Sequence, residues 1–148
     1  MSAKITPMKI LKWLLLAAVL IQLIPFGHSH TNPPVTQEVV WDSTQTAELA
    51  RRACYDCHSN QPTWPWYSNV APVSWLVQRD VNEGRSHLNF SEWEKPGRHV
   101  KDVAEQVKEG EMPPWFYRPL HPLARLSEAD KQALMTGAEK SLGQQGYK

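Results

Sequence analysis

The chain contains two cysteines, which lie three residues apart and are followed directly by a histidine, in the order Cys54-Tyr55-Asp56-Cys57-His58. In the pattern C-x-x-C-H, each thiol can add to one vinyl group of haem, so that two thioethers form, and the histidine offers its imidazole to the iron. The spacing i, i+3 places both sulfurs on one face of a helix. The motif therefore predicts one covalently bound haem c, with the two cysteines as cofactor-binding residues and the histidine as a metal ligand.

Two other kinds of chemistry use paired cysteines. A redox-active C-x-x-C lies on a helix backed by a thioredoxin-like sheet, and this chain shows no strand pattern. A zinc site would need two histidines beside Cys54 and Cys57, and a histidine adjoining the second cysteine does not fit zinc-finger spacing. The available histidines are His87, His99 and His121. These two alternatives and a chance occurrence of the motif stay open, whereas a disulfide framework and any four-cysteine site are excluded.

Met112 is the best candidate for the sixth ligand of the iron. It lies in the loop Gly-Glu-Met-Pro-Pro (residues 110–114), where two prolines fix the backbone and remove hydrogen-bond donors. Such a loop is a poor place for a methionine that only fills the core. The rivals are the same three histidines as above, and the last of them stands in a proline-framed loop of its own. The sequence thus predicts His58 and Met112 as metal ligands.

Aromatic and basic side chains near these residues are candidates for lining the cofactor. Indole and phenol groups could wall the macrocycle and bond its propionates, but a small helical domain also uses tryptophan as core. The aromatic candidates are Trp64, Trp66, Tyr67, Trp75, Trp115, Phe116 and Tyr117. The basic candidates for the propionates are Arg51, Arg52 and Arg125, for which a solvated surface position is the competing interpretation.

The N-terminus is typical of an exported protein. Residues 13–26 read WLLLAAVLIQLIPF, follow three lysines and lie in a stretch of 27 residues without an acidic side chain. The run is short for a spanning helix, which needs about 20 residues, but it just spans if Lys12 snorkels to the interface. The triplet 27–29 permits cleavage after Ser29. We expect residues 1–27 to be an uncleaved transmembrane anchor in the bacterial inner membrane, with a cleaved signal as the alternative.

The remaining chain divides into a linker and one helical domain. Residues 28–38 are polar and proline-stiffened, and residues 39–148 form the predicted haem-binding domain. Apolar residues at helical spacing predict four helices, with Gly84 and Gly110 as helix stops and Ser127 with Asp130 as an imperfect capping box. Their expected ranges are about 43–57, 72–84, 98–109 and 128–142. No segment alternates as a strand does, so the predicted fold class is all-α.

The sequence also resembles a family of small bacterial proteins, the haem-binding domain family. The resemblance rests on residues 54–75 (CYDCHSNQPTWPWYSNVAPVSW), 110–114 and 120–127, and covers roughly residues 39–142. Members are similar to monohaem c-type cytochromes and typically carry one N-terminal hydrophobic segment. The resemblance therefore implies a small cytochrome c-like helical domain, with haem attached at the two cysteines and ligated by the adjoining histidine. The methionine before the last helix also resembles the distal ligand segment of small class I cytochromes c.

Charge and composition narrow the function. The net charge is +1 and no basic stripe is present, which excludes a chain built to bind nucleic acid. No acid–base pair or nucleophile accompanies the motif, which argues against an enzyme. The leading hypothesis is electron transfer in the periplasm between redox partner proteins, expected to be membrane-bound. The alternatives are a ligand-binding or peroxidase-like haem protein with a labile or open sixth position, and a module without haem that uses Cys54 and Cys57.

Overall fold

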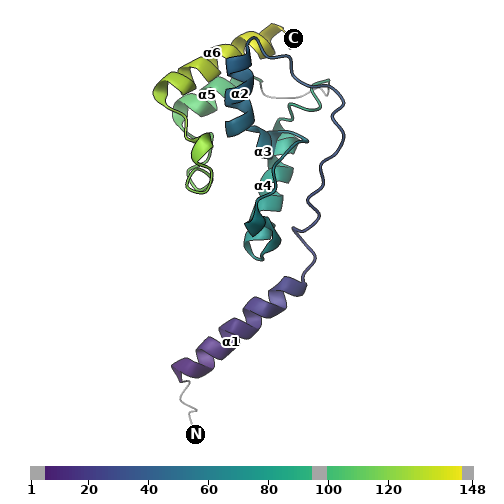
Figure 1. Cartoon of the computed structure of the whole chain (residues 1–148), viewed down its shortest axis with the longest axis vertical. Helices are drawn as coiled ribbons and strands as arrows, with labels where there is room; N and C mark the ends of the chain where they lie inside the picture. The colour runs from purple at the N-terminus through teal and green to yellow at the C-terminus, as the bar shows by residue number, and fades with distance from the viewer. Residues whose placement is uncertain (1–5, 95–99, 145–148) are drawn as a thin grey trace. The chain divides into compact units, whose positions relative to one another are not determined.

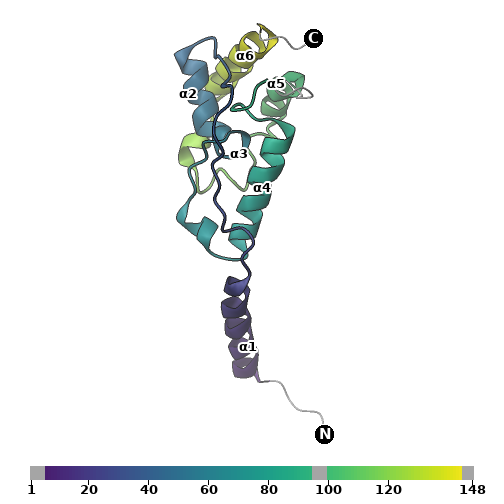
Figure 2. The same ribbon diagram turned by 90° about the vertical axis from the view of Figure 1, so that its right-hand side faces the viewer.

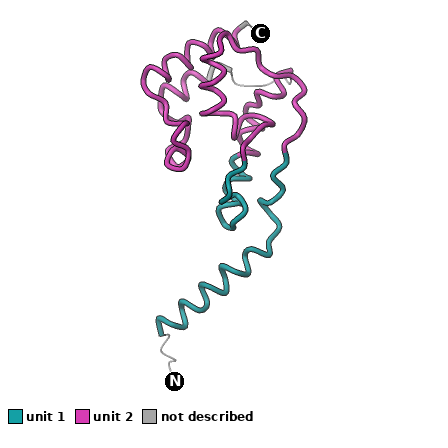
Figure 3. The backbone as a smooth tube through the Cα atoms, viewed as in Figure 1, with its two compact units in different colours: residues 1–31, 64–80 teal, residues 32–63, 81–148 magenta. Residues whose placement is uncertain are grey.

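The structure, a computed structural model, describes residues 6–94 and 100–144, and the regular elements in these ranges are helices joined by long loops (Figure 1). Two compact units are distinguished in Figure 3: Met1–Thr31 with Trp64–Asp80, and Asn32–Thr63 with Val81–Lys148. Within the described residues the β-structure is limited to an isolated bridge between Gln37 and Glu92, so the predicted all-α class is confirmed. The elements in chain order are α1 (Pro7–Leu20), η1 (Ile21–Leu23), α2 (Thr44–Ala53), α3 (Tyr55–His58), η2 (Trp66–Asn69), α4 (Val73–His87), α5 (Val100–Glu109), η3 (Pro122–Ala124) and α6 (Glu128–Gln144).

Unit 1 contains the apolar N-terminal helix. Pro7 suits the first position of α1 because its missing N–H would have no partner inside the helix. The helical stretch ends after Leu23, where Ile24 becomes extended ahead of Pro25 (φ −78°, ψ 117°). None of the residues of α1 is buried within the chain. Among the described residues no helix is both long and apolar enough to cross a membrane, so the predicted transmembrane helix is not supported.

The residues after this helix are folded against the start of α4 within unit 1. The Gln22 side chain donates to the Ala71 carbonyl (3.0 Å) and accepts from the Ala71 N–H (3.0 Å). Gly27 has φ +81°, and a Cβ built on it would lie 2.6 Å from the Ser74 carbonyl oxygen. Only glycine meets both conditions without strain. Gln22 and Gly27 are therefore both held in place by contacts within unit 1.

Unit 2 is built on the packing of α5 and α2 against α6, and α5 and α6 lie side by side in both Figure 1 and Figure 2. Gly137 of α6 lies so close to Thr46 of α2 that a Cβ there would overlap the threonine side chain. The buried core joins these helices to the segments before α2 and after α4, and it consists of Val39, Leu49, Ala50, Tyr55, Phe90, Trp93, Val107, Leu134, Ala138 and Leu142. This core holds the C-terminal end of α2, where the cysteine motif begins.

The predicted first helix is broken at Cys54. Ser43, the expected first residue of this helix, caps α2, because its hydroxyl accepts the Thr46 N–H (3.1 Å). Cys54 then leaves the helical region (φ −126°, ψ −34°), and its carbonyl accepts from both Cys57 N–H (3.2 Å) and His58 N–H (2.9 Å). A new turn, α3, therefore starts inside the motif, and the prediction of one continuous helix over residues 43–57 was wrong.

Gly84 does not end the second predicted helix, which continues as α4 to His87. The glycine is needed for a different reason. A Cβ at this position would overlap the Cys57 carbonyl oxygen, so the residue allows α4 to pass directly against the motif. The predicted helix stop at Gly84 was therefore wrong.

The third and fourth predicted helices end and begin as expected. Gly110 adopts φ +78° directly after α5, which confirms it as a helix stop, while the expected start near residue 98 lies outside the described residues. At α6, Ser127 and Asp130 exchange bonds: the Asp130 N–H donates to the serine hydroxyl (3.1 Å) and the Ser127 N–H donates to the carboxylate (3.2 Å). The predicted capping box is confirmed.

The C-terminal part of the predicted linker is folded into unit 2. Val39 is buried, and its N–H donates to the Phe90 carbonyl (3.0 Å). Gln37 donates to the Ser91 carbonyl (3.2 Å) and accepts from the Trp93 N–H (3.0 Å). These backbone bonds attach the segment before α2 to the segment after α4.

Candidate haem site

The turn at Cys54 and helix α3 present the three predicted site residues together. Cys54, Cys57 and His58 are all partly buried. The two thiols are not joined in a disulfide, and Cys54 packs against the core of unit 2. Both cysteines therefore stand on a turn whose backbone is fixed at its start by the core.

The imidazole of His58 is oriented by the backbone that follows α4. Its Nδ1 lies 3.1 Å from the Leu88 carbonyl oxygen. A carbonyl only accepts, so Nδ1 carries the hydrogen and the lone pair of Nε2 is left for a metal. Burial lowers the pKa of His58, although the carbonyls of Leu88 and Gly84 oppose that shift. The neutral imidazole is the form that ligates a metal.

Gly84 shapes the surface against which the motif lies. A Cβ on this residue would overlap the Cys57 carbonyl oxygen and lie 2.9 Å and 3.0 Å from the carbonyl carbon and Cβ of the same cysteine. Because Leu88 lies one turn further along the chain, the same stretch that supplies the imidazole's acceptor also sets the position of Cys57. The sequence predicts a helix stop at Gly84. A glycine inside an apolar helical pattern can instead indicate close packing of two segments, and that interpretation would have been the right one.

The two competing interpretations of the cysteines find no support here. Burial, with a smaller contribution from the neighbouring Cys57, raises the pKa of the Cys54 thiol to about 12. A redox-active C-x-x-C needs a thiol whose pKa is lowered. No group of three histidine, cysteine, aspartate or glutamate side chains suited to a metal ion occurs in the part of the chain that the structure describes. His99, one of the proposed zinc ligands, lies outside that part.

Tyr55, the first residue between the cysteines, points into the core. Its hydroxyl donates to Glu38 Oε1 (2.5 Å) and accepts from Trp41 Nε1 (3.0 Å). Its ring stacks on Phe90 at 5.5 Å between centroids. Burial, and then the bond to Glu38, raises the pKa of the phenol well above its usual range. This side of the motif is therefore part of a buried, hydrogen-bonded core.

Asp56, the second residue between the cysteines, makes its contacts away from the core. Its Oδ1 accepts the Thr63 N–H (3.0 Å), and its Oδ2 accepts the Tyr117 hydroxyl (2.5 Å). Tyr117 follows Met112 by five residues in the chain. The carboxylate thus connects the cysteine motif to the loop that carries the predicted sixth ligand. Sequence reasoning did not single out Asp56, because the motif leaves its second x position unspecified.

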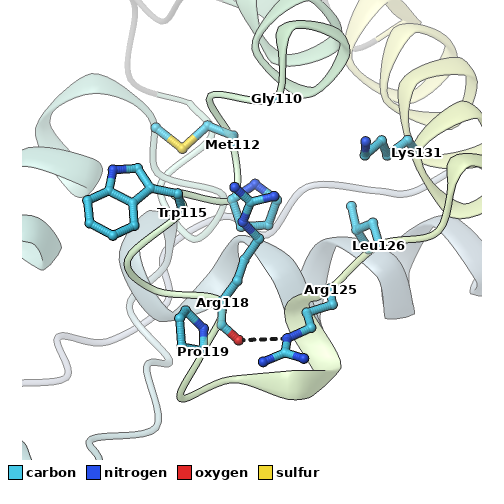
Figure 4. Close-up of a pocket in the computed structure, with 9 residues that line it drawn as sticks. Gly110, Met112, Trp115, Arg118, Pro119, Arg125, Leu126 and Lys131 are labelled. Carbon is cyan, nitrogen blue, oxygen red and sulfur yellow. Dashed lines mark hydrogen bonds between the residues drawn. The ribbon is translucent and has the colours of Figure 1, made fainter.

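Met112 is held just beyond α5 and lines a pocket of about 370 Å³. Its N–H donates to the Gln106 carbonyl (3.1 Å), which satisfies one acceptor at the end of α5. Figure 4 shows the methionine and Trp115 at one side of the pocket and Leu126 and Lys131 at the other. A thioether, an indole and aliphatic groups here form the wall of a single pocket.

Three cationic side chains also line this pocket: Arg118, Arg125 and Lys131. The Nε of Arg125 donates to the Arg118 carbonyl (3.1 Å; dashed in Figure 4), so the two arginines are linked through the backbone. Arg125 was a predicted propionate partner, whereas the other two cations were not identified. The remaining predicted arginines are engaged elsewhere: Arg51 lies over the Tyr55 ring (5.0 Å), and Arg52 pairs with Asp130 (2.8 Å).

The predicted aromatic cluster divides between the two units. Trp115 and Phe116 are exposed in unit 2 beside the methionine. In unit 1, Trp64 stacks on the His30 ring (4.5 Å, 19°), and Trp66 is 78% exposed. Neither unit therefore contains the whole aromatic cluster, and the predicted aromatic wall is not found within one unit.

The rival histidines occupy different settings. His87 is exposed at the end of α4. His121 stacks on the Tyr117 ring at 3.7 Å and 9°, and its Nδ1 lies 3.0 Å from the Tyr117 carbonyl oxygen. The His121 imidazole therefore contacts the same tyrosine that bonds Asp56.

Comparison with protein families decides what kind of cofactor these residues serve. A family model described as a haem-binding domain matches residues 16–140. The chain belongs to the haem-binding domain family. The match begins inside α1, earlier than the resemblance at residues 39–142 suggested. No curated protein and no solved structure matches the chain.

The residues of unit 2 fit haem. The two thiols are not joined in a disulfide and have the C-x-x-C-H spacing that attachment to two vinyl groups requires. The imidazole that follows them has its Nδ1 3.1 Å from the Leu88 carbonyl oxygen. The pocket at Met112 combines apolar walls with cations, but its lining does not include Cys54, Cys57 or His58. Haem is the cofactor that the family match indicates, and the thiols and imidazole of the motif are suited to it.

Proposed function

We propose that this haem-binding protein is an exported monohaem c-type cytochrome that carries electrons. In this proposal Cys54 and Cys57 form the two thioethers, while His58 and Met112 ligate the iron. The observation that carries it is the bond of His58 Nδ1 to the Leu88 carbonyl beside two unbridged thiols, because an oriented neutral imidazole is what a haem ligand requires.

Bound haem supplies an iron that alternates between the ferrous and ferric states. The chain's own residues keep both ligands in place during that change. His58 is tied to the backbone after α4, and Met112 is tied to the last turn of α5. A thioether ligand favours the ferrous state and raises the reduction potential. The cations Arg118, Arg125 and Lys131 are proposed to pair with the propionates.

A second candidate function is a ligand-binding or peroxidase-like haem with a labile sixth position. Met112 is only partly buried, and the guanidinium group of Arg118 lines the same pocket, where it would stabilise an anionic ligand. Electron transfer is preferred because Met112 has a fixed backbone position and packs against the core.

We further propose that the protein acts on the periplasmic side of the inner membrane, where it exchanges electrons with membrane-bound redox proteins. The N-terminal segment is proposed to stay attached, because cleavage after Ser29 would remove Gln22 and Gly27 from their contacts in unit 1. Full-length protein should then sediment with membranes and withstand a high-salt wash. A soluble periplasmic form that starts at His30 would contradict this part of the proposal.

The absorption spectrum of the reduced, purified protein tests the proposed function. Sharp low-spin bands without added ligand, unchanged under carbon monoxide, are expected for iron with two protein ligands. High-spin bands that shift on carbon monoxide addition would favour the second candidate. A colourless protein would contradict both.

A further inference from the structure

Both residues between the cysteines take part in a hydrogen bond between a tyrosine hydroxyl and a carboxylate. The Tyr55 hydroxyl donates to Glu38 and the Tyr117 hydroxyl donates to Asp56, both at 2.5 Å. The first bond lies in the core and joins the motif to the segment before α2. The second joins the motif to the loop after Met112. The same chemistry therefore serves two different parts of unit 2.

The carboxylate of Asp56 is well placed to act as a connector. Its two oxygens are engaged in different directions, one by the Thr63 N–H (3.0 Å) and one by Tyr117. The first bond fixes the side chain relative to the loop that follows the motif. Because the bond from Thr63 already orders the Asp56 carboxylate, the bond from Tyr117 attaches the loop that carries Met112 to a fixed point.

The tyrosine at the other end of this bond is also held. The His121 ring stacks on it at 3.7 Å and 9°, and His121 Nδ1 lies 3.0 Å from the tyrosine's own carbonyl oxygen. The Tyr117 N–H donates to the Pro114 carbonyl (3.1 Å), which closes a turn directly after Pro113. Ring, hydroxyl and backbone of Tyr117 are thus all fixed within the loop that begins at Met112.

We propose that Asp56 and Tyr117 form a latch that keeps the Met112 thioether on the iron, with His121 as a positioning residue for Tyr117. This inference rests on the proposed ligation by Met112. The latch makes the haem attachment motif itself the anchor for the sixth-ligand loop. Opening the latch should not remove the methionine ligand but should let it leave more often.

Cyanide binding to the ferric full-length protein measures how often the methionine leaves. Tyr117→Phe removes one hydroxyl and keeps the ring that stacks on His121. A hydrogen bond to a charged group contributes enough for about a tenfold effect, so cyanide should bind about tenfold faster. The weak far-red band of methionine-ligated ferric haem should persist in this variant, because the ligand itself is unchanged.

Tyr55→Phe is the matched control, since it removes the other tyrosine–carboxylate bond of the motif. It should lower the stability of the fold and leave the cyanide rate within about twofold of wild type. Asp56→Asn should give a smaller acceleration than Tyr117→Phe, because the amide oxygen still accepts a hydrogen bond. Asp56→Ala also removes the bond from the Thr63 N–H, so it should accelerate cyanide binding at least as much as Tyr117→Phe. Adding Tyr117→Phe to Asp56→Ala should have no further effect, as expected for one shared bond.

Three results would overturn the latch. Equal cyanide rates in Tyr117→Phe and wild type, with the far-red band present in both, would refute the latch while Met112 ligation stands. Equal acceleration by Tyr55→Phe would show that loss of stability alone explains the effect. A wild-type protein without the far-red band would remove the proposed methionine ligand and the latch with it.

Discussion

His58 and Met112 are supported in different ways, although both belong to unit 2. The histidine follows a turn that is anchored in the core, and its ring bonds the Leu88 carbonyl. One turn earlier, a Cβ on Gly84 would overlap the Cys57 carbonyl oxygen. The methionine lies in a loop beside an open pocket, next to Trp115, which is 75% exposed. The histidine side depends mainly on buried packing, whereas the methionine, which also packs against the core, stands in a loop that is held by a few hydrogen bonds.

This difference teaches how one small domain can both retain a cofactor and adjust it. With the proposed thioethers in place, covalent attachment and buried packing would make the histidine side insensitive to small changes. A loop held by single hydrogen bonds responds to each of them, because removing one bond shifts an equilibrium by about tenfold. We therefore expect substitutions on the histidine side to affect haem retention and stability, and those on the methionine side to affect potential and ligand exchange.

The largest effect is expected from replacing both thiols. Cys54→Ala with Cys57→Ala removes the atoms that form the thioethers, so no haem should stay on the protein in denaturing electrophoresis. The intact mass should fall by one haem relative to wild type after correction for the substitutions. If haem extracted freely from the wild type into acidic solvent, it would not be covalently attached at Cys54 and Cys57, and the proposed difference between the two sides of the site would fail.

Met112→Ala probes the methionine side alone. The far-red ferric band should vanish and the reduction potential should fall by on the order of 0.1–0.3 V, a fraction of the roughly 0.8 V that axial ligands control. Covalent haem should be retained, as judged by mass. His121→Ala should keep the band, and the opposite pattern in these two variants would assign the sixth ligand to His121.

Gly84→Ala tests the packing of the histidine side. The new Cβ would overlap the Cys57 carbonyl, and overpacking of this kind costs about 1–3 kcal/mol in the free energy of unfolding. Gly143→Ala is the matched control, because nothing lies within 4 Å of a Cβ there and alanine favours a helix by about 0.5–1 kcal/mol. Chemical denaturation of both variants gives the two values. Equal stabilities would mean that α4 does not press on the motif.

The smallest effect is expected at Arg52. Its ion pair with Asp130 is 2.8 Å long, and both side chains are about one-third exposed (35% and 31%). Such pairs contribute about 0–1 kcal/mol, so Arg52→Ala should lower the free energy of unfolding by less than 1 kcal/mol and leave the potential unchanged. If Arg52→Ala changed the reduction potential as much as Met112→Ala, this surface pair would control the potential, and the methionine side would not be the part of the site that adjusts it.

Much of the architecture followed from local patterns. The all-α class, the Gly110 stop and the capping box at Ser127 each depend on a few neighbouring residues, and each was predictable. The break at Cys54 was not, because it arises when one carbonyl accepts two N–H groups at the start of a new turn.

The donor atoms of the proposed site were chosen from short sequence patterns, and they stay predictions. The side-chain and backbone groups that support them could not be predicted in this way. The Leu88 carbonyl, the Gly84 contact and the Asp56–Tyr117 bond join residues from 27 to 61 positions apart, and only the tertiary fold brings such pairs together. Gly84 was also assigned the wrong role because a glycine that ends a helix and one that lets two segments touch look alike in sequence.

The central claim is that one covalently attached haem is ligated by His58 and Met112. Near-infrared magnetic circular dichroism of the ferric full-length protein tests it most directly, because the charge-transfer band in that region depends on the identity of both axial ligands. We predict the band typical of histidine–methionine ligation in the wild type and its loss in Met112→Ala. A wild-type band typical of two histidines, or a high-spin spectrum, would contradict the account.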